Sequence, residues 1–172
     1  SNEESPGKMY TRKAGFLNRD VYGFDVEFFG LTPKEVTAMD PQHRLFIETC
    51  WRAMEDAGLN IADLRGSRTG VFAGISGMDY AAAHLHSGDL DLVDAYSVTG
   101  IAFSTLSGRV SYLFGFEGPS MAIDTACSSS LVSLHLAIQS LRRKECDLAL
   151  VGGVNLMLNP EIHVGFSNLK GI

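Results

Sequence analysis

Residues 119–154 alternate between strand and helix, and this order leaves the chain few possible architectures. Two short apolar runs, 119–125 and 147–154, are bounded or closed by glycine or proline, as buried strands are. Between them, 127–143 repeats apolar residues at the spacing of a helix side that packs on a core. Those residues are Leu131, Leu134, Ile138 and Leu141. A strand–helix–strand unit with a right-handed crossover predicts an α/β fold with a parallel or mixed sheet.

Two helices with strong start signals precede this unit. Thr32 is predicted to cap a short helix that begins at the following proline, and Glu35 is predicted to close a capping box with it. Asp40 and the next proline begin a longer helix over 41–57, on whose apolar stripe Cys50 lies. Farther upstream, aromatic residues are expected to anchor an irregular N-terminal arm to the core. They are Phe24, Phe28 and Phe29.

The middle of the chain combines a strand with further helix. Residues 69–75 predict a buried strand, 76–95 a loop with helical fragments, and 97–114 a helix. Three small residues follow one another at every fourth position of that helix: Gly100, Ser104 and Gly108. Small residues let another backbone approach closely. That backbone belongs either to this chain or to a second copy of it.

The composition limits the partners and the location of the protein. With 172 residues, 45% of them hydrophobic, the chain is predicted to form one globular unit. Its net charge of −6 argues against a nucleic-acid-binding surface. Three distant cysteines argue against a disulfide scaffold or a C-x-x-C zinc site, and they favour a reducing, cytoplasmic location. No apolar run has the length of a membrane span. Few strands and no closing element predict part of a domain.

The sharpest chemical feature is Cys127, which follows a predicted strand and is expected to open the next helix. It lies in the run Asp124-Thr125-Ala126-Cys127-Ser128-Ser129-Ser130-Leu131. This is the pattern of a nucleophile elbow with cysteine in place of serine. A helix N-terminus lowers the pKa of a thiol, and its free N–H groups bind a developing oxyanion. Spacing alone leaves open whether Cys127 is reactive or a buried packing residue.

This run resembles the active-site signature of β-ketoacyl synthases, in particular the ketosynthase domains of modular (type I) polyketide synthases. Other blocks of the family pattern follow in the same order along essentially the whole chain. They are residues 6–9, 15–17, 24–35, 39–44, 51 with 55–58, 70–74, 108–112 and 145–155. His43 departs from the pattern, because the family usually has glutamine at that position.

The resemblance implies a thiolase-like layered α/β fold, of which only part of the N-terminal half is present. It divides the chain into an irregular arm (1–30) and an α/β half-domain (31–172) with the elbow at 124–131. It also implies decarboxylative Claisen condensation, in which Cys127 takes an acyl chain from an acyl carrier protein and a malonyl-type extender lengthens that chain. The substrates travel on the phosphopantetheine of the carrier protein, so no cofactor bound to this chain is expected.

The same resemblance assigns roles to a few residues. The backbone of Cys127 and Ser128 at the helix start would support the oxyanion, and the acyl pocket would be lined by Thr125, Ala126 and Phe166. The complete domain is expected to form a homodimer. The family's two catalytic histidines and second oxyanion donor would lie beyond residue 172, so the 172 residues alone are expected to be inactive.

Three alternatives remain. The chain could come from a fatty acid synthase, or it could be a non-catalytic dimerisation or binding module that retains the half-fold. A cysteine hydrolase would need a histidine near Cys127, and His135 and His163, the latter expected in a loop, are poorly placed. His84, His86, Asp79 and Asp89 are too loosely spaced to predict a metal site. Cys50 and Cys146 are interpreted as packing residues.

Overall fold

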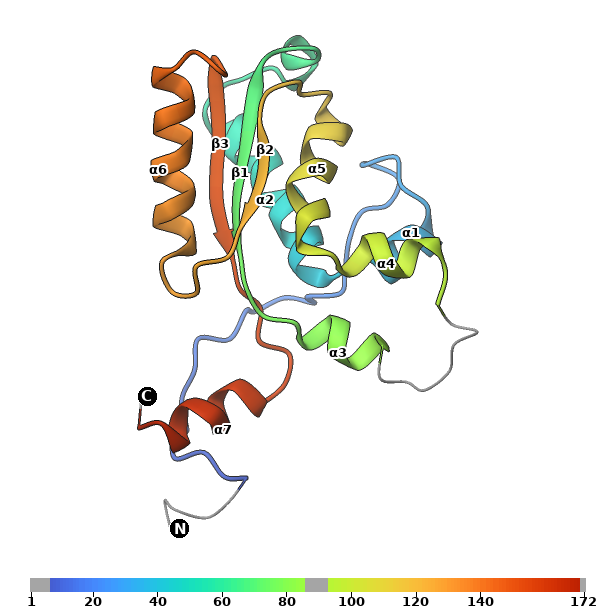
Figure 1. Cartoon of the computed structure of the whole chain (residues 1–172). Coiled ribbons are helices and arrows are strands. Elements are labelled where there is room, and N and C mark those ends of the chain that lie inside the picture. The colour runs from blue at the N-terminus through green and yellow to red at the C-terminus, as the bar shows by residue number, and fades with distance from the viewer. Residues whose placement is uncertain (1–6, 86–92, 171–172) are drawn as a thin grey trace.

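The computed structural model describes residues 7–85 and 93–170, which form a three-stranded sheet with helices on both faces (Figure 1). The helices are α1 (Pro33–Ala38), α2 (Pro41–Asp56), the 3-10 helix η1 (Ile61–Leu64), α3 (Asp79–Leu85), α4 (Ala95–Ile101), α5 (Phe103–Phe114), α6 (Ser129–Arg142) and α7 (Glu161–Asn168). The strands are β1 (Thr69–Ile75), β2 (Ser120–Ile123) and β3 (Leu148–Val154). Of these helices, none is both long and apolar enough to cross a bilayer, within the described ranges.

All three strands are parallel, and β1 lies between β2 and β3. The register pairs Val71 of β1 with Ser120 on one side and with Leu150 on the other. Every residue of β1 is buried, as expected of a parallel strand covered on both faces. The predicted strand–helix–strand unit is confirmed, since β2 leads through α6 to β3. Its two strands lie on opposite sides of β1.

Helices cover the two faces of the sheet unequally. Helix α6 covers one face, and α2 and α5 cover the other (Figure 1). The larger apolar cluster lies on the α2–α5 side and consists of Val36, Met39, Phe46, Ile47, Cys50, Met54, Val71, Ala73, Ile75, Leu106, Val110, Phe114 and Phe116. A small cluster of Phe72, Ala137 and Cys146 lies between β1 and α6. Because few large side chains lie between α6 and the sheet, this helix lies close to the sheet backbone.

Helix α6 turns its small residues toward the sheet, which contradicts the orientation expected from its leucines. The buried side is made of Ser129, Ser133, Ala137 and Ser140. The expected core stripe faces outward, with Leu131 70% and Leu134 45% exposed. The Ser133 hydroxyl donates to the Ser129 carbonyl (2.8 Å), so this polar group is satisfied inside the helix when it is buried. Small residues therefore permit a closer approach to the sheet than leucine would.

The helix expected over 97–114 is two helices, because the chain breaks at Ala102 between α4 and α5. At the break, the Thr105 hydroxyl lies within hydrogen-bond distance of the carbonyls of Thr99 and Ala102 (2.7 Å each), and the Thr105 N–H donates to the Ala102 carbonyl (3.1 Å). The row of small residues is consequently divided. Gly100 of α4 is buried against the chain's own backbone, and the Asp40 N–H donates to its carbonyl (2.9 Å). Gly108 of α5 is exposed.

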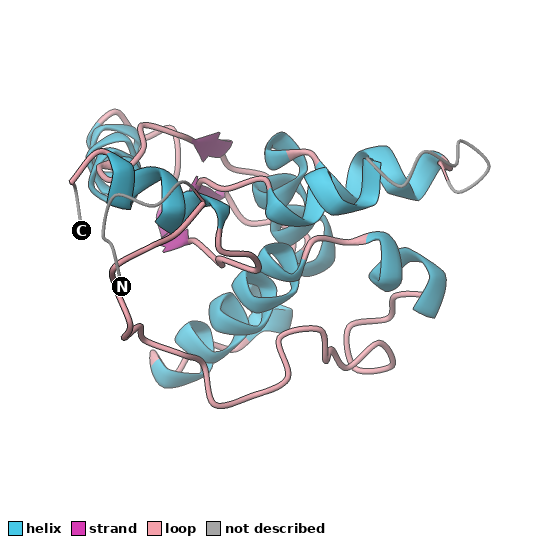
Figure 2. Ribbon diagram, turned by 90° about the horizontal axis from the view of Figure 1, so that it is seen from below, coloured by secondary structure: helices cyan, strands magenta, loops and turns pink. Residues whose placement is uncertain are grey.

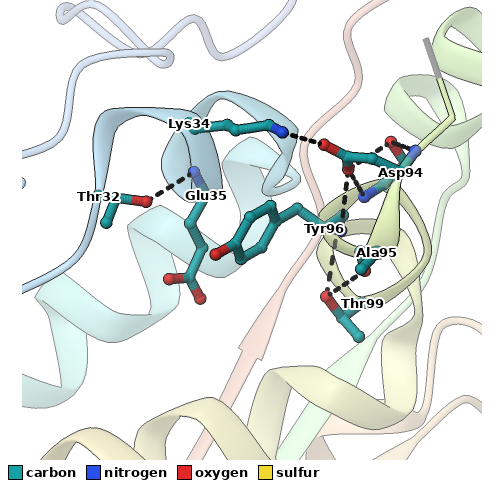
Figure 3. A network of polar contacts seen from close by, with 8 residues as sticks. Thr32, Lys34, Glu35, Asp94, Ala95, Tyr96 and Thr99 are labelled. Carbon is teal, nitrogen blue, oxygen red and sulfur yellow. Dashed lines mark hydrogen bonds and ion pairs between the residues drawn. The ribbon is translucent and has the colours of Figure 1, made fainter. Parts of the chain in front are cut away.

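A polar network at the first turn of α4 connects this helix to α1 (Figure 3). The Asp94 carboxylate caps α4 by accepting from the N–H groups of Tyr96 and Ser97 (2.9 and 3.0 Å). It also pairs with the Lys34 ammonium (2.9 Å). The hydrogen bond from Lys34, together with that from the Ser97 backbone, lowers the pKa of Asp94 to about 2. The network joins two helices that lie about sixty residues apart along the chain.

Aromatic stacking anchors the segment before α1, as the sequence predicts. The rings of Phe24 and Phe29 stack with centroids 4.8 Å apart, and Phe28 meets Trp51 of α2 edge to face at 4.7 Å. Trp51 in turn lies 6.0 Å from Phe114 of α5. Such pairs add to the free energy gained by burying the rings. Residues 24–29 are therefore attached to the α2–α5 side of the core.

Candidate active site

The carboxyl ends of the three parallel strands meet at one edge of the sheet, and a pocket of about 570 Å³ lies there. Figure 2 views the molecule from this end of the strands. Segments that follow β1, β2 and β3 form the walls, and α7 closes one side. The lining residues are Gly74, Ile75, Ser76, Gly77, Asp79, Ala126, Cys127, Ser129, Ser130, Gly153, Val154, Asn155, Leu156, Met157, Ile162 and Phe166. Open α/β sheets bind ligands at this edge.

Cys127 lies in this wall, on the turn between β2 and α6, and is exposed. The residue before it, Ala126, has a φ of 54°, in the left-handed region that costs a non-glycine residue about 1–2 kcal/mol. The Asp124 carboxylate accepts from the Ala126 N–H (2.9 Å) and stabilises this conformation. The strain of the predicted elbow thus falls on Ala126. Helix α6 begins at Ser129, so Cys127 precedes the helix instead of opening it.

Two serines bind the turn to the first residues of α6. The Ser129 hydroxyl accepts from the Thr125 N–H (2.9 Å) and donates to the Ala126 carbonyl (2.7 Å). The Ser128 hydroxyl donates to the Thr125 carbonyl and hydroxyl (2.8 Å each), and its N–H also donates to that carbonyl (3.3 Å). Thr125 and Ser128 are therefore engaged with each other in the turn. Thr125 does not form part of the pocket wall, whereas Ala126 and Phe166 do.

Two polar side chains, for which the sequence predicts no role at the pocket, join its walls. The Gln42 side chain donates to the Gly77 carbonyl (3.2 Å) and accepts from the Leu156 N–H (3.1 Å), so it links the segments after β1 and β3. The Asp79 carboxylate accepts from the N–H groups of Leu158 and Asn159 (2.8 and 3.2 Å). The sequence signal for Gln42 was its position directly after the proline that opens α2, but its hydrogen-bond partners are distant in sequence and could not be predicted from it.

The histidines take varied positions. His135 is exposed on α6, and His163 lies within α7, not in the expected loop. Neither lines the pocket that contains Cys127. His86 and Asp89 lie outside the described residues, as does the side chain of His84. In the part of the chain that the structure describes, no group of three His, Cys, Asp or Glu side chains is arranged to hold a metal ion.

The other two cysteines are buried, as predicted for packing residues. Cys50 and Cys146 are 6% and 2% exposed. Burial raises the pKa of the Cys50 thiol to about 12. The Cys146 thiol lies 3.5 Å from the Ser140 hydroxyl on the inner side of α6. Cys127 is the one cysteine of the sequence that combines exposure with a pocket.

Comparison with known proteins assigns the family. The model of the β-ketoacyl synthase N-terminal domain matches residues 1–172. The chain therefore belongs to the β-ketoacyl synthase family, and the resemblance inferred from its motifs is confirmed. It is 53% identical over 167 residues to polyketide synthase GfsA of Streptomyces halstedii, and 52% identical over 169 residues to erythronolide synthase EryA2 of Saccharopolyspora erythraea. These matches cover 97% and 98% of this chain but 2% and 5% of the relatives.

Solved ketosynthase structures have the same fold. The ketosynthase domain OzmH KS7 of the oxazolomycin system of Streptomyces albus superposes with a TM-score of 0.87 at 38% identity, over 97% of this chain and 28% of that one. The ketosynthase from module 6 of the bacillaene synthase of Bacillus subtilis gives 0.78 at 40% identity, over 90% and 25%. The thiolase-like α/β class is thus confirmed, with the chain corresponding to part of the N-terminal half.

Proposed function

We propose that this chain provides the nucleophile of a polyketide-extending ketosynthase, with Cys127 as the residue that accepts the growing acyl chain. The supporting observation is the exposed Cys127, which lies in a strained turn at a pocket beside Phe166, within a family of β-ketoacyl synthases. A thiol presented in this way divides a difficult carbon–carbon bond formation into two simpler steps.

In the first step, the Cys127 thiolate attacks the carbonyl of an acyl thioester on a carrier protein. The bond from that carbonyl to the phosphopantetheine sulfur breaks, and the carrier leaves as its thiol after taking up a proton. In the second step, a malonyl-type extender loses CO2, and its carbanion attacks the acyl–Cys127 thioester. The new carbon–carbon bond gives a β-ketoacyl thioester on the second carrier and returns Cys127 as thiolate.

The surrounding residues serve this chemistry through position. The backbone N–H of Cys127, with the positive end of α6 nearby, would supply one of the two donors that stabilise the oxyanion on the acyl carbonyl. Ser128 would support this donor through its bonds to Thr125. Ala126 and Phe166 would contact the acyl chain, and Thr125 would hold the turn. Residues 31–172 would form the part of the domain that carries the elbow, with 1–30 as an arm.

The proposed partners are acyl carrier proteins, whose phosphopantetheine carries both substrates, so this chain would hold no cofactor of its own. The complete domain would act as a homodimer. Free thiols at all three cysteines agree with a reducing, cytoplasmic setting. The catalytic histidines of the family would come from outside these 172 residues, so condensation would require the full-length protein.

Two other functions make different predictions about the thiol. A fatty acid synthase ketosynthase would acylate Cys127 equally well and differ in the acyl chains it accepts. A dimerisation or binding module would leave Cys127 unacylated. The 53% identity to a polyketide synthase favours polyketide extension.

Mass spectrometry of the full-length protein after incubation with a synthetic acyl thioester tests the proposal. We expect the mass of one acyl group on the peptide that contains Cys127, and no such gain in Cys127→Ala. The matched control is Cys146→Ala, which replaces a buried cysteine outside the pocket and should still be acylated at Cys127. Acylation of Cys127→Ala at another site of this chain, or no acylation of the natural protein, would refute the assignment.

A further inference from the structure

We infer that Gly74 and Gly153 are positioning residues for Cys127: because they lack side chains, the first turn of α6 rests directly on the sheet. The inference depends on the proposed role of Cys127 as nucleophile. It concerns how the thiol is presented to the pocket, a property that is measurable without any acyl donor.

The two glycines lie side by side on neighbouring strands. Gly74 of β1 and Gly153 of β3 are partners in the parallel register, so their Cα positions face the same side of the sheet. A Cβ at Gly74 would lie 2.9 Å from the backbone carbon of Ser129 and the nitrogen of Ser130. A Cβ at Gly153 would lie 2.9 Å from the Ser130 Cβ. Both distances are shorter than real Cβ contacts, so a side chain at either position would push α6 away.

The first turn of α6 transmits this spacing to Cys127. Ser129, which rests on Gly74, is 7% exposed, and its hydroxyl bonds to the backbone of both Thr125 and Ala126. Those two residues immediately precede Cys127 in the chain. A shift of Ser129 therefore either pulls the strained turn along or breaks its hydrogen bonds. In both cases the thiol moves relative to the pocket wall formed by the segment after β3.

The neighbouring residue on β3 offers a control with equal crowding on the opposite face. A Cβ at Gly152 would lie 2.9 Å from the ring of Phe46 on α2, the same distance that a Cβ at Gly153 would have from Ser130. Gly152→Ala and Gly153→Ala thus add the same methyl group to the same strand. One disturbs the core on the α2 side, and the other disturbs α6.

The test measures alkylation of Cys127 by iodoacetamide in the full-length protein as a function of pH, read from the tryptic peptide 110–142. Circular dichroism and the unfolding midpoint report on folding separately. We expect Gly153→Ala to slow alkylation about tenfold or to shift its pH profile, because the thiolate is the reacting form and a thiol moved away from the positive end of α6 loses part of the field that stabilises this form. Gly152→Ala should alkylate at the rate of the natural protein even where it lowers the unfolding midpoint.

Removal of the opposing atom provides a rescue. Ser130→Gly deletes the Cβ that the added methyl group would meet, so Gly153→Ala with Ser130→Gly should alkylate at the rate of Ser130→Gly alone. If Gly153→Ala does not fold, this double variant should recover the fold and the alkylation rate together.

Three results would overturn the inference. They are unchanged alkylation in folded Gly153→Ala, equal slowing in Gly152→Ala, and a double variant that folds but still alkylates slowly. A protein that alkylates as expected but fails to acquire an acyl group would refute the proposed function, and only the structural effect of the glycines on the thiol would remain.

Discussion

Arg109 of α5 forms an ion pair with Glu35 of α1, across 74 positions of sequence. Their side chains are 12% and 21% exposed, so the pair is largely shielded from water. The Arg109 guanidinium also donates to the Thr99 carbonyl of α4 (3.4 Å). The sequence predicts that the Glu35 carboxylate closes a capping box with Thr32. In the structure, the Glu35 N–H donates to the Thr32 hydroxyl (3.2 Å) while the Glu35 carboxylate pairs with Arg109, so Arg109 joins α5 to both α1 and α4.

Breaking this pair should be costly. Glu35→Ala leaves the largely buried Arg109 charge without its counter-charge, and we expect it to lower the free energy of unfolding by about 3 kcal/mol in urea denaturation. Glu35→Ala with Arg109→Met should lose less than the two single variants summed, because the unpaired charge is gone. Lys34→Met, which breaks the exposed pair with Asp94, is the comparison and should cost less. Additive losses would contradict the coupling.

His43 should make the protein sensitive to acid. Its ring is fully buried, and this burial, with the nearby Arg109 charge, lowers its pKa from 6.5 to about 3. Below about pH 6.5, His43 is therefore protonated in the unfolded chain, whereas in the folded chain it takes up a proton only at about pH 3. In this window, each unit of falling pH should remove about 1.4 kcal/mol of stability through His43.

Denaturation curves measured at several pH values test this effect. His43→Gln, which introduces the residue usual in the family, should flatten the loss of stability between about pH 6 and pH 4. The control, His135→Gln, replaces an exposed histidine and should retain the natural acid dependence. If both variants lose stability with the same slope as the natural protein, other groups cause the acid sensitivity.

Two helical glycines should respond to alanine with opposite signs. A Cβ at Gly100 would lie 2.1 Å from the Ala38 carbonyl oxygen, which cannot move without α1, so Gly100→Ala should cost about 3 kcal/mol or more. Apart from the adjoining backbone of α5 itself, no atom of the described residues lies within 4 Å of a Cβ at Gly108, and Gly108→Ala should gain about 0.5–1 kcal/mol. Unfolding midpoints measure both. Destabilisation by Gly108→Ala would instead indicate that a second copy packs on this face of α5.

The three cysteines should differ in reactivity toward a small alkylating reagent. At about pH 8, native-state labelling followed by peptide mapping should modify Cys127 and leave Cys50 and Cys146 intact, because only thiolates with access to the reagent react. Labelling in about 6 M urea, where burial is lost, should modify all three. Native labelling of Cys146 would show that α6 separates from the sheet.

Helix α6 illustrates what hydrophobic periodicity can and cannot predict. Leucines at helical spacing correctly predict a helix, yet the side facing the sheet is the serine and alanine side. Periodicity identifies the residues that share a face, but the choice of face depends on what lies opposite. At the first turn, Gly74 and Gly153 let α6 lie against the sheet backbone, and these contacts join positions far apart in sequence. The break between α4 and α5 at Ala102 was also missed, although the Thr105 hydrogen bonds found there are local in sequence.

The candidate site likewise has one part that the sequence predicts and one part that it does not. Cys127 and its turn could be predicted, because a strand, a tight turn and a helix are adjacent in sequence. The partners that enclose the pocket could not, because Gln42 reaches Gly77 and Leu156 across 35 and 114 positions. The spacing of a single sequence contains no information on such contacts. Phe166 lies in the same pocket wall as Cys127, and its role in lining an acyl pocket, which the family resemblance implies, stays a prediction.

The glycine pair beneath α6 limits how the proposed nucleophile could be transplanted to another scaffold. A graft of residues 124–131 would carry the hydrogen bonds of Asp124, Ser128 and Ser129. It would leave behind Gly74 and Gly153, which belong to two other strands. A host sheet with alanine or valine at those positions would lift the grafted helix and misplace the thiol. The smallest portable unit is therefore three strand ends with their helix, not a loop.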